Sequence, residues 1–435
     1  MTCDSPRGPD TKTVSGGASA SGAAVGVAAS RRLGREFGKL WTASSTSAIG
    51  DGISLTAAPL IASTLTDDPR LIAGVTMALT LPYALFGIPA GVLADRVDLR
   101  RSMARIDFFR GGLVLMFALS VAFGWAGLGV MYGCFFLIGT CETFFRNASQ
   151  ILVPSVVADD RLVDANGRLL GAQTAANQFV GPLVGSALFV LAPAVPFGLD
   201  SVTFFVSAVL LTRLRTTTPH DRVAPAERPG LLADMTTGAR WLMRHRLLRN
   251  LSLTAGAINL VYTGSLAVLV VYAHKVLGLG DLGYGVLLAC QAIGAVAAAK
   301  LSPLLVRRIG GEWTLVCVVT TMAVGDAVIW QTSTAWVVGF ALALGACASI
   351  TWDVVVVVLR QTIIPPSLQG RVNSIYRLFA WGAMPVGAGL AGVVSKGLGA
   401  TAVYGLGAGI MAAVAVRLVI GARRHWFADA QAQKL

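Results

Sequence analysis

The sequence predicts an all-α membrane protein with twelve transmembrane helices in two six-helix bundles. Of its 435 residues, 55% are hydrophobic and 13% are charged, whereas soluble domains carry about 25% charged residues. Apolar runs of about 20 residues recur along the chain, and each is long enough to cross a hydrocarbon layer about 30 Å thick. Lipid is therefore the expected surroundings of most of the chain.

The apolar runs form two groups of six, separated by a charged stretch. The first group is Trp41 to Leu65, Leu71 to Ala94, Met103 to Phe123, Leu128 to Ser149, Val163 to Leu191 and Pro196 to Leu214. The second is Leu251 to Ala273, Tyr284 to Val306, Thr314 to Gln331, Ala335 to Leu359, Val372 to Val394 and Ala402 to Ile420. We therefore expect a disordered tail (1–40), an N-terminal bundle (41–214), a central loop (215–250), a C-terminal bundle (251–422) and a second tail (423–435).

The basic residues predict the orientation of these runs. The chain carries a formal net charge of +13, and its arginines gather in alternate connecting segments, whereas the opposite loops hold Arg70, Lys275 and Lys396. Because Lys and Arg stay on the cytoplasmic side, both termini are expected to be cytoplasmic in a multi-pass protein of the cell membrane. Cations spread between apolar runs also argue against nucleic acid as a partner, since no basic module on a soluble face is present.

The central loop contains a segment that alternates apolar and basic residues. Leu231, Leu232, Trp241 and Leu242 are interleaved with arginines after a proline-rich stretch. This pattern suits an amphipathic helix on the membrane surface. A solvated linker helix is the alternative interpretation.

Cysteine and histidine usage gives no sign of an enzyme. The six cysteines show no CxxC spacing, and the four histidines lie in loops or near the ends of the apolar runs. Neither a metal-ligand pattern nor a Walker-type loop occurs. We therefore expect no catalytic residue, no metal and no cofactor.

The loop after the second run contains the most specific motif, Gly91-Val-Leu-Ala-Asp95-Arg96-Val-Asp98-Leu-Arg100-Arg101. It resembles the signature G-x-L-A-D-R-x-G-x-R-R of the major facilitator superfamily, and the twelve-run layout agrees over the chain beyond its tail. Asp98 stands where that family usually has Gly. The resemblance implies the major facilitator fold and a secondary transporter of small molecules.

The same resemblance implies a gating latch. Gly87 and Gly91 would let the second helix approach a neighbour closely, and Asp95 would face the positive end of the eleventh helix. Such a cluster stabilises one packing of the two halves and breaks in the other. The remaining members expected are Arg96, Arg100 and Arg101, with Asp107 and Arg110 joining from near the cytoplasmic end of the third helix. Ordinary positive-inside residues are the alternative.

A second motif, Gly181-Pro182-Leu-Val-Gly185, resembles the Gly-Pro signature of exporters in this superfamily, with Ser186 in place of a further Gly. The strings Gly50-Asp51-Gly52 and Glu142 to Gln150 are similar to the branch of macrolide efflux proteins and the enterobactin exporter. This implies antiport of drugs, antibiotics, siderophores or other secondary metabolites, and multidrug resistance. Proton-coupled uptake is the alternative, and a non-transporting receptor is a further one.

Charged groups at membrane depth cost about 2.5–3.5 kcal/mol to insert and therefore indicate function. Asp51 is the first candidate to carry the coupling proton, because it has no charged partner within one helical turn. Glu142 is a second candidate, but its spacing to Arg146 also suits a structural ion pair. Asp326 and Asp353 complete the set.

The substrate is expected to contact aromatic and polar side chains of the spans. Each of these residues is alternatively a packing residue or an interfacial anchor, and the protein is expected to be monomeric in the bilayer. The candidates are Tyr83, Arg146, Asn177, Gln178, Tyr262, Trp352 and Trp381.

Overall fold

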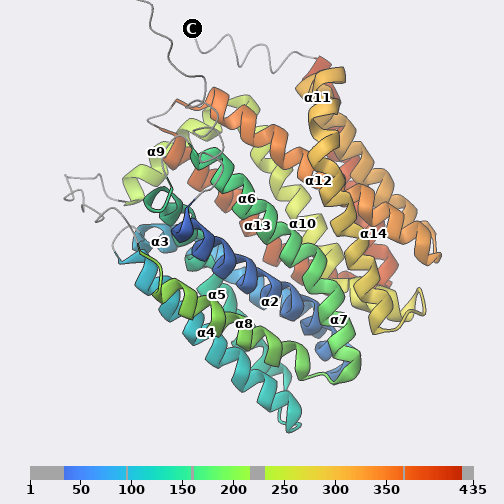
Figure 1. The fold of residues 1–435 in the computed structure, drawn as a ribbon. Coiled ribbons are helices and arrows are strands. Elements are labelled where there is room, and N and C mark those ends of the chain that lie inside the picture. The colour runs from blue at the N-terminus through green and yellow to red at the C-terminus, as the bar shows by residue number, and fades with distance from the viewer. Residues whose placement is uncertain (1–33, 95–96, 158–160, 216–230, 366–367, 424–435) are drawn as a thin grey trace, which may run out of the picture.

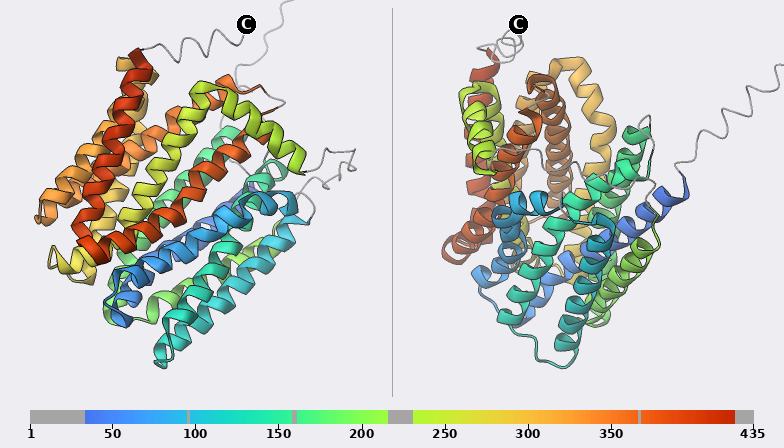
Figure 2. Two further views of the ribbon diagram at one scale, coloured as in Figure 1. Left: turned by 180° about the vertical axis from the view of Figure 1, so that it is seen from behind. Right: turned by 90° about the vertical axis from the view of Figure 1, so that its left-hand side faces the viewer.

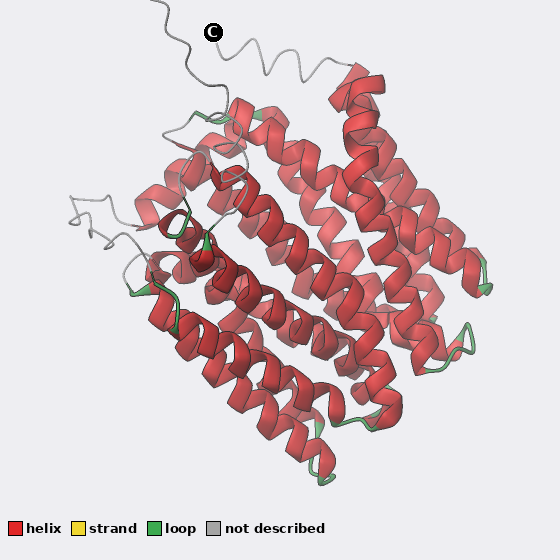
Figure 3. Cartoon of the chain, viewed as in Figure 1, coloured by secondary structure: helices red, strands yellow, loops and turns green. Residues whose placement is uncertain are grey.

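The computed structural model describes residues 34–94, 97–157, 161–215, 231–365 and 368–423, and this part of the chain is helical almost throughout (Figure 3). The helices follow the apolar runs in order. They are α2 (Arg35–Leu65), α3 (Pro69–Ala94), α4 (Leu99–Ala122), α5 (Leu128–Leu152), α6 (Leu162–Ala175), η3 (Ala176–Val180), α7 (Gly181–Leu191), α8 (Val195–Thr212), α9 (Leu231–Arg244), α10 (Arg246–Lys275), α11 (Asp281–Gln331), α12 (Ala335–Ile363), α13 (Gln369–Leu398) and α14 (Ala400–Arg423).

The helix lengths are consistent with the twelve expected crossings. Ten helices of the described residues are long and apolar enough to span a bilayer. One of these, α11, has 51 residues and is broken at Gly310, where φ is 79°, so it is long enough to cross twice. The charged helix α4 has 24 residues and packs between α5 and α8, which gives it the length and the surroundings of a further span.

Two helices begin five or more residues before the expected spans. Helix α2 begins at Arg35, so the N-terminal tail does not extend to residue 40, and residues 1–33 lie outside the described part. Helix α10 begins at Arg246, five residues before the predicted span. Both extensions are polar first turns, which apolar periodicity alone does not detect.

The helices form two bundles, α2 to α8 and α10 to α14, which are coloured blue to green and yellow to red in Figure 1. Helix α3 packs against α13, and α7 packs against α11, so these two pairs join the bundles. Figure 2 shows α13 running beside α3 in the view from behind. The bundles therefore meet along a seam built from both halves of the chain.

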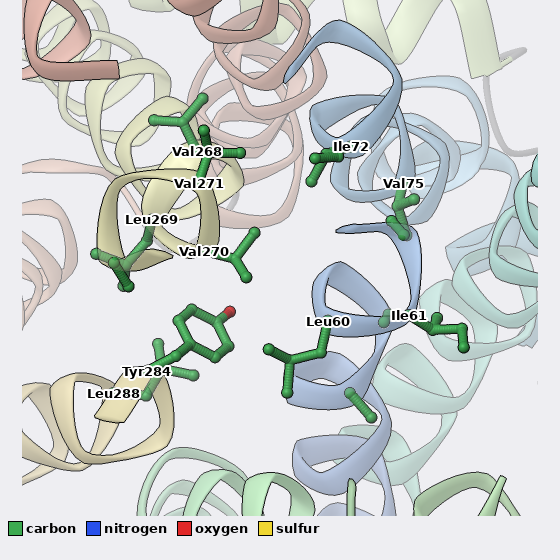
Figure 4. Packing of buried hydrophobic residues seen from close by; sticks show 14 of the residues in the cluster. Leu60, Ile61, Ile72, Val75, Val268, Leu269, Val270, Val271, Tyr284 and Leu288 are labelled. Carbon is green, nitrogen blue, oxygen red and sulfur yellow. The ribbon is translucent and has the colours of Figure 1, made fainter. Parts of the chain in front are cut away.

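Among the described residues, the hydrophobic clusters that join the bundles lie at one end of the seam. The largest buried cluster combines N-terminal residues such as Leu60 and Ile72 with C-terminal residues such as Val270 and Tyr284 (Figure 4). Two other clusters occupy the opposite end, and each belongs to a single bundle: one is built around Leu40 and the other around Trp352. Because close van der Waals packing of side chains holds membrane helices together, this asymmetry shows which end of the seam is closed.

The central helix α9 packs on the C-terminal bundle. Leu242 is buried in the cluster around Trp352, and Gly238 lies against the backbone oxygen of Arg371 at the start of α13. The expected amphipathic helix is present, but part of its apolar face packs against the C-terminal bundle and not against the membrane surface. Residues 216–230 of the loop lie outside the described part.

Candidate transport site

A buried guanidinium is the centre of the charged groups in the N-terminal bundle. Arg110 on α4 is fully buried, and its Nη2 donates to Oδ1 of Asp51 on α2. Its Nη1 lies 3.3 Å from Oε2 of Glu142 on α5 and 3.6 Å from Oδ1 of Asp107 on α4 itself. One cation therefore faces three carboxylates from three helices.

Aromatic and hydroxyl groups complete the surroundings of this centre. The guanidinium carbon of Arg110 lies 4.1 Å from the ring centroid of Phe204 on α8, a favourable cation–π distance. Ser207 donates to Asp107 over 2.6 Å. These contacts fix the position of Arg110 and leave its Nε without a hydrogen-bond partner among the described residues.

A fourth carboxylate, Asp200 on α8, extends the group. It is buried and accepts hydrogen bonds from Ser54 and from Thr203. The sequence analysis missed Asp200, although the rule that selected Asp51 applies to it equally, since it lies inside the apolar run Pro196 to Leu214. We call Asp51, Asp107, Arg110, Glu142 and Asp200 the Arg110 network.

The structure corrects the expected position of two residues. Asp107 and Arg110 do not lie near the cytoplasmic end of their helix with the loop motif, because Arg110 is the twelfth of the 24 residues of α4 and sits at mid-span. Asp51 has no charged partner within one helical turn, as expected, but Arg110 pairs with it from another helix. Spacing along one helix cannot reveal such a pair.

Arg146 and Tyr83 connect the Arg110 network to the seam between the bundles. Arg146 Nη2 lies 3.3 Å from Glu142 Oε1, and the guanidinium stands 5.8 Å from the Tyr83 ring. The Tyr83 and Trp381 rings meet edge to face across the seam at 5.9 Å. Arg377, which the sequence analysis did not select, lies over Trp381 at 5.4 Å. Three of the expected substrate contacts are therefore neighbours.

The other four expected contacts lie in different surroundings. The backbone of Asn177 lies against Gly52 of α2, whereas Gln178 is exposed. Tyr262 is 39% exposed and lines a cavity inside the C-terminal bundle. Trp352 is 1% exposed in the core of that bundle, so the expectation that it faces substrate is wrong for this conformation.

The Gly-Pro motif lies at a change of helix geometry. The five residues of η3 form a π-helix directly before Gly181, and π-helical turns occur frequently at functional sites. A methyl group at Gly181 would lie 2.6 Å from the Cα of Gly52, and one at Gly185 would lie 2.7 Å from the carbonyl oxygen of Ile53. The motif therefore allows α7 to pack directly on α2, the helix that carries Asp51.

The loop motif is only partly described. Asp95 and Arg96 lie outside the described residues, and Gly91 is placed in α3 without a description of its surroundings. Gly87 makes no close approach to the described residues, since a methyl group added there would meet none of their atoms within 4 Å. Arg100 donates to the carbonyl oxygen of Leu214 over 2.6 Å within the same bundle. The expected close packing at Gly87 is thus absent in this conformation.

Asp98 acts as the cap of α4. Its side chain accepts a hydrogen bond from the Arg101 amide, and its φ is −67°. Asp is among the preferred N-cap residues, and this φ needs no glycine. The departure from the family signature is therefore compatible with the local turn.

Two ion pairs join the bundles at their closed end. Asp67 lies 3.0 Å from Lys275, and Asp68 lies 3.3 Å from Lys396. The two acids belong to the loop after α2, and the two lysines belong to the last turns of α10 and α13. The sequence placed both lysines on the poorly charged face but did not predict their partners.

Comparison with known proteins agrees with this architecture. The profile of the family described as transmembrane secretion effector matches residues 32–434. MFS-type transporters of Mycobacterium tuberculosis and Mycobacterium bovis, both named as uncharacterized, are 28% identical over 300 residues. The match spans 63% of this chain and 66% of the length of each of these relatives.

Solved transporters share the fold. An alanine variant of the nucleoside transporter NupG superposes with a TM-score of 0.75 at 12% identity, covering 89% of this chain and 99% of the other. A bacterial homologue of the iron transporter ferroportin in an inward-facing state gives 0.66 at 17% identity, covering 88% and 100%. These identities support the fold alone.

Proposed function

Because the chain belongs to the transmembrane secretion effector family of major facilitator transporters, we propose that it is a proton-coupled exporter of small organic molecules. The observation that carries the proposal is the Arg110 network within the membrane core. Transporters of this family and fold are in general not enzymes, and no catalytic residue or cofactor is proposed.

The charge balance of the network supports proton binding. With Arg146 included, the connected groups hold four carboxylates and two guanidiniums, so full ionisation would leave two uncompensated negative charges. Uncompensated charge inside a low-dielectric core is strongly unfavourable. Proton uptake by one or more of these carboxylates relieves that cost, and Asp51 lies on the helix that contacts the Gly-Pro motif.

The position of the seam supports alternating access. The bundles pack together at the end that carries Asp67 and Asp68, away from the basic connecting segments. If those segments are cytoplasmic, as the positive-inside rule expects, the structure is the state whose cytoplasmic end is open. Gly87 has no close neighbour among the described residues, which is consistent with a state open at the cytoplasmic end. The latch of the loop motif would then form in the state that is closed at that end.

The direction of transport and the substrates rest on less specific features. The Gly-Pro motif at the π-helix and the short strings around Asp51 and Glu142 favour export of drugs, antibiotics, siderophores or other secondary metabolites. The aromatic seam of Tyr83 and Trp381 supplies a surface suited to apolar rings. Both features support the proposal without selecting one compound.

Transport into everted membrane vesicles tests the proposal. Vesicles containing the protein are given macrolides, siderophores and hydrophobic cations, and accumulation is measured with and without an uncoupler. Export predicts accumulation that collapses when the proton gradient is removed. Accumulation restricted to right-side-out vesicles would instead establish uptake and overturn the direction.

The Asp51→Asn variant tests the proton site. Asn keeps the size of the side chain but cannot carry the charge, so gradient-driven flux should fall to background while the amount of folded protein stays constant. Asp164→Asn is the matched control, because Asp164 forms an exposed ion pair with Arg168 within α6. Unchanged flux in Asp51→Asn would remove this carboxylate from the coupling mechanism.

A further inference from the structure

A second polar site lies inside the C-terminal bundle, apart from the Arg110 network. Helices α10, α11, α12 and α14 form a partly open cavity lined by apolar residues together with Asp326, Gln291, Ser265 and Ser349. The space open to the centres of water-sized molecules is about 70 Å³, whereas one water needs about 10–15 Å³. The cavity can therefore hold an ion together with water.

Within the part of the chain that the structure describes, no partner accounts for the position of the Asp326 carboxylate. No Lys, Arg or His of the described residues lines the cavity, and no ion pair or hydrogen bond to Asp326 is found among them. Asp326 lies five residues before the end of α11 at Gln331, which is about 7.5 Å along a helix. A carboxylate at this depth needs a compensating charge or proton.

Ser265 and Tyr404 line the same cavity as Asp326, and Gly407 lies beside its carboxylate. A methyl group at Gly407 on α14 would lie 2.9 Å from Asp326 Oδ2, so the absence of a side chain there makes room for the oxygen. Ser265 Oγ is buried and has no hydrogen-bond partner among the described residues. Tyr404 donates to the carbonyl oxygen of Ser265 over 3.2 Å, which ties α14 to α10 beside the cavity.

We propose that this cavity binds one small monovalent inorganic cation such as Na⁺. Asp326 would supply the single negative charge, and Gln291, Ser265 and Ser349 would supply neutral oxygen ligands. One carboxylate balances one positive charge, whereas Ca²⁺ and Mg²⁺ sites rely on more carboxylates or on substrate phosphates. The site is independent of the proposed export function, because binding requires neither a proton gradient nor a substrate.

Direct binding of radioactive Na⁺ to the purified full-length protein tests the site. The assay is run at constant ionic strength and mildly alkaline pH, with choline as the replacement cation. We expect one saturable Na⁺ per chain, and we expect Asp326→Asn to lower the affinity at least about tenfold, since a charge partner in a low-dielectric site contributes more than about 1.4 kcal/mol. Gly407→Ala should weaken binding as well, because its methyl group displaces Oδ2.

Asp353→Asn is the matched control, as it neutralises another carboxylate of the same bundle that does not line the cavity. It should leave Na⁺ binding unchanged. If Asp326→Asn does not fold, the proposal is tested by Ser265→Ala, which should weaken Na⁺ binding, and by the Na⁺ titration of the natural protein. Absence of saturable Na⁺ binding, equal loss in Asp353→Asn, or displacement of Na⁺ by choline would each overturn the proposal. Failure of export in vesicles would leave this result unaffected.

Discussion

The carboxylate of Asp68 lies 3.3 Å from the ammonium nitrogen of Lys396, and this pair joins the loop after α2 to the last turn of α13. A second pair, Asp67 with Lys275, lies nearby and also crosses between the bundles. Both stand at the end where Figure 4 shows apolar side chains of the two bundles packed together. Opening this end requires both pairs to separate, so they are expected to bias the conformational equilibrium.

The first prediction concerns this bias. Replacing Asp68 by Asn and Lys396 by Gln should favour the state that opens at this end, by about two- to fivefold, which is the range of exposed ion pairs. The measurement is the rate at which an impermeant thiol reagent modifies Val75→Cys, a buried position of the joining cluster, in a chain whose six native cysteines are replaced. Asp164→Asn should leave the rate unchanged, and equal rates in all variants would contradict the prediction.

The second prediction concerns pH at the same end. The hydrogen bond from the Arg70 guanidinium, with those from the Arg70 amide and Lys396, holds the pKa of Asp68 well below its ordinary range. Arg70 is two residues from Asp68 and keeps these bonds when the bundles separate, so only the contact with Lys396 couples this pKa to closure. A depressed pKa gives a stabilisation that is complete above the ordinary value and is lost progressively as pH falls below it, so closure should be intact above the ordinary Asp pKa of about 3.9 and weaken gradually below it. Protection of Val75→Cys that is already lost well above that pH would contradict the prediction.

The third prediction concerns Arg110. Arg110→Leu would leave Asp51 and Asp107 without their cation and Glu142 with Arg146 alone, and removing one partner of a buried ion pair costs about 3–5 kcal/mol. Thermal unfolding of the purified protein should show a lower midpoint than Arg146→Leu, because the Arg146 side chain is 52% exposed and water can compensate. Equal loss in the two variants would argue against a central role for Arg110.

The fourth prediction separates packing from gating. Gly52→Ala should lower stability by about 1–3 kcal/mol, the usual cost of overpacking, because its methyl group would lie 2.5 Å from the carbonyl oxygen of Asn177. Gly87→Ala should leave stability unchanged, since that site is open in this conformation. If the latch forms in the opposite state, Gly87→Ala should still slow transport. Normal transport in stable Gly87→Ala protein would refute the latch.

The sequence predicted the helices well because a membrane span leaves a local record. A run of about twenty apolar residues is stable as a helix that crosses the bilayer and not as a segment exposed to water. The observed helices α2 to α14 follow the predicted runs closely. It also selected Asp51, Glu142 and Asp326 by a rule that needs no structure, namely the cost of charge at membrane depth. The polar first turns at Arg35 and Arg246 were missed, since they carry no apolar periodicity.

By itself, the sequence determined the fold class, the helix order and the charged residues that lie inside apolar runs. These follow from hydrophobicity and charge, which are properties of each residue and its neighbours in the chain. Only the tertiary structure decided which of these residues meet: Arg110 with Asp51, Tyr83 with Trp381, and Asp68 with Lys396. Such pairs join segments far apart in the chain, and their energy depends on distances between helices that no local pattern specifies. The closed end of the seam and the cavity around Asp326 follow from the same three-dimensional packing.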